Sequence, residues 1–188
     1  MKKSIIVIAI FTSSIICNAQ EVIKQKEIAL TFSGLYSYGL TYSFGNSNAL
    51  WRFSTLYSVQ AKSTTNYPTY DLLVNSMSAG ASLGKEFRHS LSHKLFIRYG
   101  IELSFSYDHN YYKSLANEHE DFKYSPGINL LGGILYSISD NFGAGVLLLP
   151  YFEYQTGKDI SNGVESDVSG FAYGLSSSSA QINLIVKF

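Results

Sequence analysis

The sequence predicts an all-β protein in which eight antiparallel strands form a closed transmembrane β-barrel. Three observations support this fold class. Apolar and polar side chains alternate with period two through most of the chain, and no segment after the first twenty residues is apolar for eighteen residues in a row. Aromatic residues make up 15% of the 188 residues, and charged residues also make up only 15%. Soluble domains carry roughly 25% charged residues, so the low charge indicates a surface that faces lipid.

Residues 1–19 have the features of a secretory signal peptide, and residues 20–188 are expected to form one barrel domain. Lys2 and Lys3 precede an apolar run over residues 5–16, and Ala19 ends the segment. The run is shorter than the about 20 residues of a membrane-spanning helix, which makes a retained anchor the weaker interpretation. Cys17 is the only cysteine, but Ile16 stands where a lipoprotein signal needs a small residue, so lipidation is also the weaker interpretation.

The charge balance excludes one class of partner. Loss of Lys2 and Lys3 with the signal peptide reduces the 14 basic residues to 12, against 14 acidic residues. This balance lacks the basic patch of a nucleic-acid-binding protein, and no nucleic acid is expected as a partner.

The alternation is clearest over residues 94–108. The odd positions from Leu95 to Tyr107 are apolar, whereas the even positions are polar or glycine with the exception of Phe96. Near the end of the chain, Ile185 is a similar exception among polar positions. Since successive strand residues point to opposite faces, each strand has one apolar and one polar face.

The connections define the strands and their orientation. Eight strands are predicted at about 27–34, 38–45, 50–61, 74–88, 94–108, 123–139, 142–156 and 169–188. Short turns near 45–48, 88–93 and 139–141 alternate with long connections near 62–73, 109–122 and 157–168, while the connection at 34–37 is tight. Bacterial outer-membrane barrels have short periplasmic turns and longer extracellular loops, so this asymmetry predicts the same orientation. A rival count joins 27–45 into one strand and divides 169–188 near Ser176 to Ser179, which would place every long loop in the periplasm.

Aromatic side chains of outward parity collect at both ends of the predicted strands. A periplasmic girdle is expected from Phe44, Trp51, Phe53, Phe87, Phe142 and Phe188. Tyrosines and phenylalanines such as Tyr57, Tyr107 and Tyr154 stand at the opposite rim. Lys85 is the main outward charge between these belts, and it lies near the periplasmic end. A soluble β-barrel or sandwich remains the alternative, although its surface would need more charge.

The C-terminal residues carry a resemblance to a known class. Ile182, Leu184, Val186 and the terminal Phe188 resemble the C-terminal strand signature of outer-membrane proteins, which implies recognition by the barrel-assembly machinery. The stretch GLTYSFGNSNALWRFSTL and the overall layout resemble the outer-membrane-protein β-barrel domain common in Bacteroidetes, and more distantly the small eight-stranded enterobacterial barrels. The apolar parity changes across Ser176 to Ser179, so a β-bulge there, or a later strand start, is expected.

Charged residues of inward parity predict a polar network inside the barrel. They are Glu27, Arg52, Glu86, Arg88, Arg98 and Glu102, with Glu153 nearer the long connections. An eight-stranded barrel has an interior that side chains can fill, so opposite charges there are expected to pair as a structural plug. A gated narrow pore is the functional alternative.

No catalytic, cofactor or metal site is assigned from the sequence. Ser106, Asp108 and His109 are the nearest candidates for a lipid A modifying enzyme, but adjacent strand residues face opposite sides of the wall. His109 and His119 lie in an acidic connection, where a divalent ion or lipopolysaccharide bridge is a further alternative.

The predicted function is that of a porin-like but non-enzymatic barrel of the bacterial cell envelope. It would present its extracellular loops for surface interaction, adhesion or envelope integrity, with a lipid A modifying enzyme or a narrow solute pore as alternatives. The expected partners are outer-membrane lipid, lipopolysaccharide, the assembly machinery and an unknown extracellular ligand. The expected location is the outer membrane, after cleavage of the signal peptide.

Overall fold

A computed structural model describes residues 25–33, 37–67, 70–114, 118–176 and 179–188. The predicted signal peptide lies outside these residues. Ten strand segments follow one another along the chain: β1 (Gln25–Phe32), β2 (Ser37–Asn46), β3 (Ala49–Tyr67), β4 (Tyr70–Ser90), β5 (Leu95–Lys113), β6 (Glu118–Ser137), β7 (Phe142–Leu148), β8 (Tyr151–Ser161), β9 (Val164–Gly174) and β10 (Ala180–Lys187).

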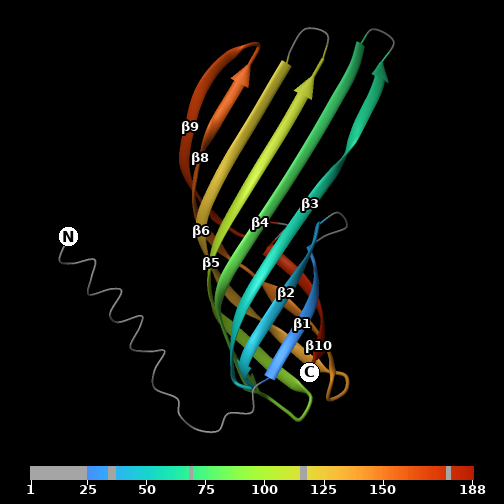
Figure 1. Ribbon diagram of the computed structural model, residues 1–188, viewed down its shortest axis with the longest axis vertical. Coiled ribbons are helices and arrows are strands. Elements are labelled where there is room, and N and C mark those ends of the chain that lie inside the picture. The colour runs from blue at the N-terminus through green and yellow to red at the C-terminus, as the bar shows by residue number, and fades with distance from the viewer. Residues whose placement is uncertain (1–24, 34–36, 68–69, 115–117, 177–178) are drawn as a thin grey trace, which may run out of the picture.

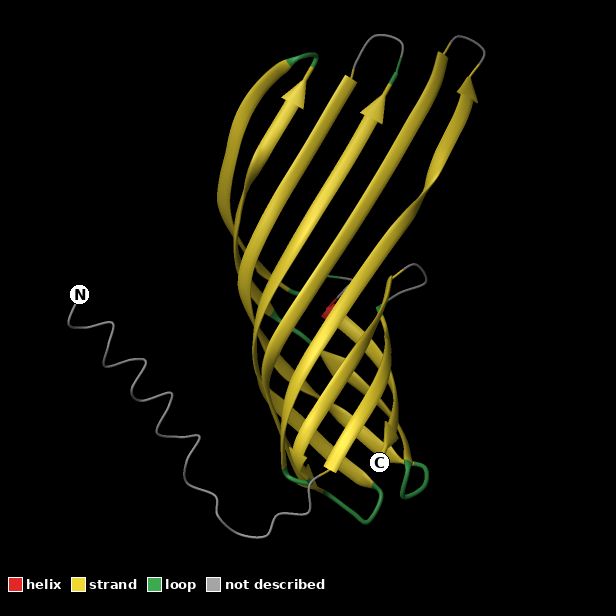
Figure 2. Ribbon diagram, viewed as in Figure 1, coloured by secondary structure: helices red, strands yellow, loops and turns green. Residues whose placement is uncertain are grey.

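The segments form a closed antiparallel barrel of eight strands, as the alternation predicts (Figures 1 and 2). Each strand pairs with its neighbour in the chain, and β10 closes the barrel against β1, with Ile28 opposite Val186 and Leu30 opposite Leu184. The segment 27–45 is two antiparallel strands rather than one, so the rival strand count is wrong. The C-terminus and the short turns lie at the same end of the barrel (Figure 1). We call this end the turn end.

β7 and β8 are two parts of one strand that spans Pro150. Both parts pair with β6 in one continuous register, with Gly132 opposite Leu148 and Asn129 opposite Tyr151. The Pro150 carbonyl still accepts a hydrogen bond from the Leu130 amide, at 2.9 Å. Proline has no amide hydrogen, so Pro150 cannot donate a hydrogen bond back to Leu130. On the opposite edge of this strand, the partner changes near Pro150 from β10 to β9.

β9 and β10 form the interrupted eighth strand. Gly174 lies opposite Tyr151 and Ala180 lies opposite Leu148, so six steps on the last strand match three on its partner. The three additional residues are an odd number, and they therefore reverse which parity faces outward. This confirms the predicted irregularity near Ser176 to Ser179, although residues 177–178 lie outside the described part of the chain.

The predicted long loops are paired strands over most of their length. β3–β4, β5–β6 and β8–β9 continue as hairpins to Tyr67/Tyr70, Lys113/Glu118 and Ser161/Val164. Figure 1 shows these hairpins rising beyond the level at which β1, β2 and β10 end. We call the six strand extensions the projecting sheet.

The outer wall of the barrel is apolar. On β5, the side chains of Ile101, Leu103 and Phe105 are about half exposed or more. Outward side chains from Ile97 to Tyr107 extend over ten residues, which at about 3.4 Å per residue and a tilt of about 40° span roughly 26 Å. Polar outward side chains begin above this band, at His109 on β5. In the described part of the chain, no helix is long and apolar enough to cross a bilayer.

Candidate functional site in the barrel interior

The six charged residues predicted to face inward lie together in the turn-end half of the barrel. We call Glu27, Arg52, Glu86, Arg88, Arg98 and Glu102 the charge network. Each of these residues is at most 7% exposed. They come from β1, β3, β4 and β5, because each stands on the inward parity of its strand. Three carboxylates balance three guanidinium groups, which allows the network to be buried without net charge.

Glu86 is the centre of the charge network and is fully buried. Arg98 donates to both of its carboxylate oxygens, at 2.9 and 2.7 Å, while Arg88 donates from Nε at 2.7 Å and Arg52 from Nη1 at 3.1 Å. Arg88 also forms a bidentate pair with Glu27, at 2.7 and 2.6 Å. Bidentate arginine–carboxylate pairs combine strength with fixed geometry, so the network crosses the lumen as a rigid plug.

Sequence reasoning restricted to charges missed the neutral members of this network. Asn183 accepts from Arg98 at 3.0 Å and donates to Thr31 at 3.0 Å, and it is 1% exposed. Thr41 continues the chain by donating to Ser54 at 3.0 Å. Thr31, Thr41, Ser54 and Asn183 all occupy inward-facing positions of their strands, so the alternation alone could have identified them.

The two apolar exceptions to the alternation also face inward. Ile185 packs with Ala29 and Leu135 in a buried cluster, and Phe96 lies against that cluster. A second buried cluster contains Leu131, Leu147 and Leu149. The interior is therefore divided, with aliphatic side chains contributed largely by β6, the β7 strand and β10, and charges contributed by β1, β3, β4 and β5.

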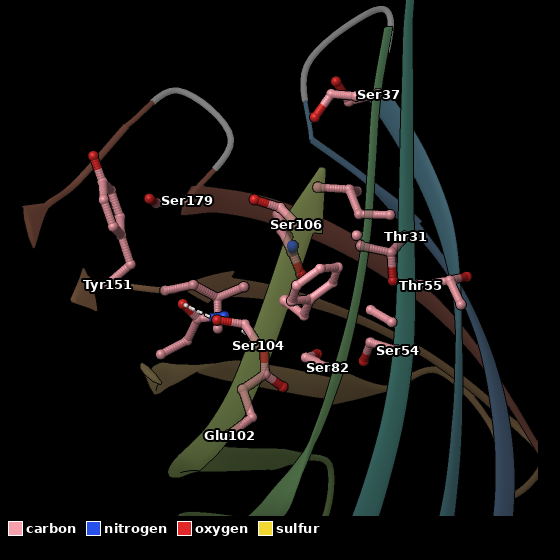
Figure 3. A pocket seen from close by; sticks show the side chains of 18 of the residues that line it. Thr31, Ser37, Ser54, Thr55, Ser82, Glu102, Ser104, Ser106, Tyr151 and Ser179 are labelled. Atoms are coloured by element: carbon pink, nitrogen blue, oxygen red, sulfur yellow. Dashed lines mark hydrogen bonds between the residues drawn. The ribbon is translucent and has the colours of Figure 1, made fainter. Parts of the chain in front are cut away.

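Above the charge network the interior opens into a cavity of about 500 Å³, which we call the upper cavity (Figure 3). Arg52 and Glu102 lie at its boundary with the network, where Arg52 Nε and Glu102 Oε2 are 3.6 Å apart. Both atoms are buried and have no hydrogen-bond partner among the described residues. Glu102 Oε1 accepts from Asn129 at 3.3 Å. Glu153, the remaining predicted inward charge, also lines the upper cavity.

The structure does not bring the three candidate enzyme residues together. Ser106 and Asp108 line the upper cavity, and Ser78 donates a hydrogen bond to Asp108. His109 lies on the other face of β5 and is 2.8 Å from Glu120. A nucleophile and its base must be within hydrogen-bonding reach, so this set does not form a triad.

The acidic end of the projecting sheet holds close pairs of basic and acidic side chains. His119 lies 3.7 Å from Asp121 and 3.4 Å from Asp159, and Lys123 is 3.4 Å from Asp121. Among the described residues, no group of three or more His, Cys, Asp or Glu side chains is placed to hold a metal ion.

The predicted girdle and C-terminal signature residues lie on the outer wall. Phe44, Phe53, Phe142 and Phe188 are 45–61% exposed. Trp51 and Phe87 are partly buried, and the Lys85 ammonium lies over both rings, at 5.7 and 5.4 Å from their centroids. Ile182, Leu184 and Val186 point outward along β10.

A comparison with solved structures supports this fold. A major outer membrane protein from Thermus thermophilus superposes with a TM-score of 0.55 at 10% identity, over 88% of this chain and 98% of that chain. Neisserial surface protein A (NspA) gives a TM-score of 0.39 at 16% identity, over 88% and 96%. No family model matches the chain, and no curated protein matches it. The resemblance to the Bacteroidetes domain therefore stays a prediction, and the likeness to the Thermus protein shows the fold.

Proposed function

We propose that the protein is a non-enzymatic outer-membrane barrel that presents the projecting sheet outside the membrane, for surface interaction, adhesion or envelope integrity. The observation that carries this proposal is the closed wall, which is apolar outside and filled with paired charges inside. An exposed apolar belt of this extent is costly in water and is favourable in lipid. The shared fold supports the same location.

The projecting sheet supplies the surface for interaction. Within the described residues, β9 pairs only with β8, and the part of β3 beyond Ser58 pairs only with β4, so both leave one strand edge without a partner in the sheet. An unpaired edge can add an extended segment of another protein through main-chain hydrogen bonds. This geometry favours a protein partner over a soluble substrate for the projecting sheet.

The membrane-facing parts have partners of a different kind. Outer-membrane lipid would contact the apolar belt, and lipopolysaccharide would contact the aromatic rim below the projecting sheet. The outward side chains of β10 and Phe188 are in the position that the assembly machinery would read, after removal of the signal peptide.

An epitope inserted into the protein and probed on intact cells tests this orientation. The turn between Asn162 and Gly163 ends the β8–β9 hairpin, and the turn at Asp140 and Asn141 lies at the opposite end of the barrel. Antibody added to intact cells should label an epitope at Asn162–Gly163 and should not label one at Asp140–Asn141 until the outer membrane is opened. Labelling of the second epitope alone would overturn the orientation, and a protein found in the soluble periplasmic fraction would overturn the membrane location.

A further inference from the structure

The upper cavity lies on the projecting-sheet side of the charge network. Figure 3 shows Ser54 of β3, Ser82 of β4, and Ser104 and Ser106 of β5 facing this space, with Glu102 of β5 below them. A volume of about 500 Å³ is within the range of pockets that hold small molecules, roughly 300–1,000 Å³. The network closes the lower end, so the cavity is a blind cup.

Several polar side chains of the upper cavity are left without a protein partner. Ser82, Ser106 and Gln181 line it and make no side-chain hydrogen bond to another described residue. Gln181 is only 8% exposed, but its unpaired amide atoms are not fully buried and are accessible from the cavity. Polar groups that face a cavity in this way are available to bind a ligand or water.

The charge of the lining selects among polar ligands. Asp108 and Glu153 contribute two carboxylates in addition to those of the charge network, and Arg52 is the single cation among the described lining residues. Arg52 lies 3.1 Å from Glu86 and 3.6 Å from Glu102, so it balances carboxylates of the network and not Asp108 or Glu153. Gln155 donates to Oε1 of Glu153 at 2.8 Å, which leaves Oε2 of Glu153 available. The excess of negative charge favours a cation.

The arrangement favours an organic cation over a metal ion. The described residues place no three His, Cys, Asp or Glu side chains around a common point. The carboxylates are instead combined with serine hydroxyls, which both donate and accept hydrogen bonds, and with the ring of Tyr151. Hydroxyl groups of a ligand match these serines, and a ligand ammonium matches the carboxylates.

We propose that the upper cavity binds a small polar molecule that carries a positively charged amine together with several hydroxyl groups, the chemistry of an amino sugar. The carboxylates of Asp108 and Glu153 bind the ammonium, while Ser82, Ser106 and the Gln181 amide bind the hydroxyls. This binding site is separate from the strand edges of the projecting sheet.

Calorimetric titration with glucosamine and glucose tests the proposal, because glucosamine carries an amine at the one position where glucose carries a hydroxyl group instead. The full protein is purified from membranes in a polyoxyethylene detergent, which contains neither sugar nor amine. Glucosamine should bind, and glucose should bind at least about tenfold more weakly, since charge-assisted hydrogen bonds are lost. Glu153→Gln and Asp108→Asn should each weaken glucosamine binding by about tenfold.

Asp167→Asn is the matched control, since Asp167 is exposed on the outer face of β9, and it should leave binding unchanged. A heat-dependent gel shift verifies that each variant is folded. Equal binding of glucose and glucosamine would overturn the charge assignment. Failure of both probes to bind would overturn the proposal. Glucosamine binding that is unchanged in both Glu153→Gln and Asp108→Asn would also overturn it, because the binding site would then lie outside the upper cavity.

Discussion

At the scale of single residues, the barrel interior depends on groups that cannot be replaced independently. Glu86 contacts three guanidinium groups from two neighbouring strands and its own, and each of these side chains is at most 3% exposed. Removal of one partner from a buried ionic network leaves an uncompensated charge, which costs more than the pair itself contributes.

Glu86→Gln is therefore expected to lower the free energy of unfolding by about 3–5 kcal/mol. The amide keeps the size of the side chain but leaves the three arginines with only two carboxylates. Urea unfolding of the protein in detergent micelles, followed by tyrosine and tryptophan fluorescence, measures the change. Glu120→Gln is the control, because the Glu120 side chain is 39% exposed and pairs only with His109 among the described residues, and it should change stability by less than about 0.5 kcal/mol. Equal effects of the two substitutions would contradict the role of burial.

Gly84 provides the space in which the charge network forms. It lies opposite Arg52 on β3 and opposite Glu102 on β5. A Cβ atom at Gly84 would lie 2.3 Å from the Ile101 carbonyl oxygen and 2.3 Å from the Glu102 Cβ, which is closer than real contacts.

Gly84→Ala is expected to destabilise the barrel by about 1–3 kcal/mol, because the strands must separate to admit the methyl group. The temperature at which the folded gel band disappears on heating measures the loss. Gly132→Ala is the matched control, since an added Cβ there meets nothing within 4 Å, and its band should persist to the wild-type temperature. If the folded band of Gly84→Ala disappeared at the wild-type temperature, the backbone around Gly84 would have more room than the structure indicates.

At the scale of elements, the hairpins extend further than the alternation predicts. The segment 157–168 contains Asn162 and Gly163, which have φ values of 50° and 80°. Asn-Gly is a preferred pair for a tight two-residue hairpin turn, so this dipeptide could have revealed the β8–β9 hairpin in the sequence. The polar composition of the segment favoured a loop, since strand extensions outside lipid do not need an apolar face.

The end of the β5–β6 hairpin is expected to respond to pH. Tyr111 donates to Glu118 at 2.7 Å and Lys113 lies 3.5 Å away, and these contacts lower the pKa of Glu118 from its ordinary 4.5. Because the pKa is lower in the folded state, the stabilisation is present above the ordinary value and is lost as pH falls through the folded value.

Amide protection factors for residues 109–113, corrected for intrinsic exchange, should therefore decrease between about pH 6 and pH 3. Tyr111→Phe removes the hydrogen bond that contributes most to the lowered pKa and should make the protection less dependent on pH. The barrel part of β5, at residues 97–105, serves as an internal reference within the same sample. Unchanged protection at 109–113 across this range would contradict the proposed contribution of Glu118.

At the scale of the whole molecule, the structure combines a closed lower barrel with an open upper sheet. In the closed part, the described strands pair with a neighbouring strand on both sides. In the projecting sheet, β3 and β9 are the outermost strands, and each has one edge without a strand partner among the described residues. A closed barrel in lipid has all its backbone groups paired internally, while open edges are tolerated only outside the hydrocarbon. The division between the two parts follows the limit of the apolar belt.

Because the lower barrel is closed and its lumen is filled, we expect a compact protein that does not conduct ions. Unboiled samples in detergent should migrate differently from boiled samples on a gel, because the paired barrel resists detergent. The same preparation should produce no stepwise current in planar bilayers, since the charge network and the aliphatic clusters fill the lumen. Glu153→Gln, which changes the upper cavity above the network, should also remain silent. Regular conductance steps in the wild-type protein would identify a pore and would contradict the plug.

The sequence by itself determined the strand number, the facing of the barrel strands and the six members of the charge network, but it did not identify Asp108 as an inward charge. These properties depend on the two-residue period, which is local and can be followed from one residue to the next. For the same reason, Phe96 and Ile185 could be recognised as exceptions but not explained, because their packing partners come from distant strands.

Only the tertiary structure decided how the inward residues combine. The pairing of Arg88 with Glu27, the position of Glu86 among three arginines and the unpaired groups of the upper cavity depend on strand register and barrel closure. Register is set by contacts between segments far apart in the chain, and a shift of one residue would turn the same side chains toward lipid. The physical reason is that the alternation of apolar and polar residues determines only which side of the wall each side chain faces. Strand register and barrel closure determine which inward side chains contact one another.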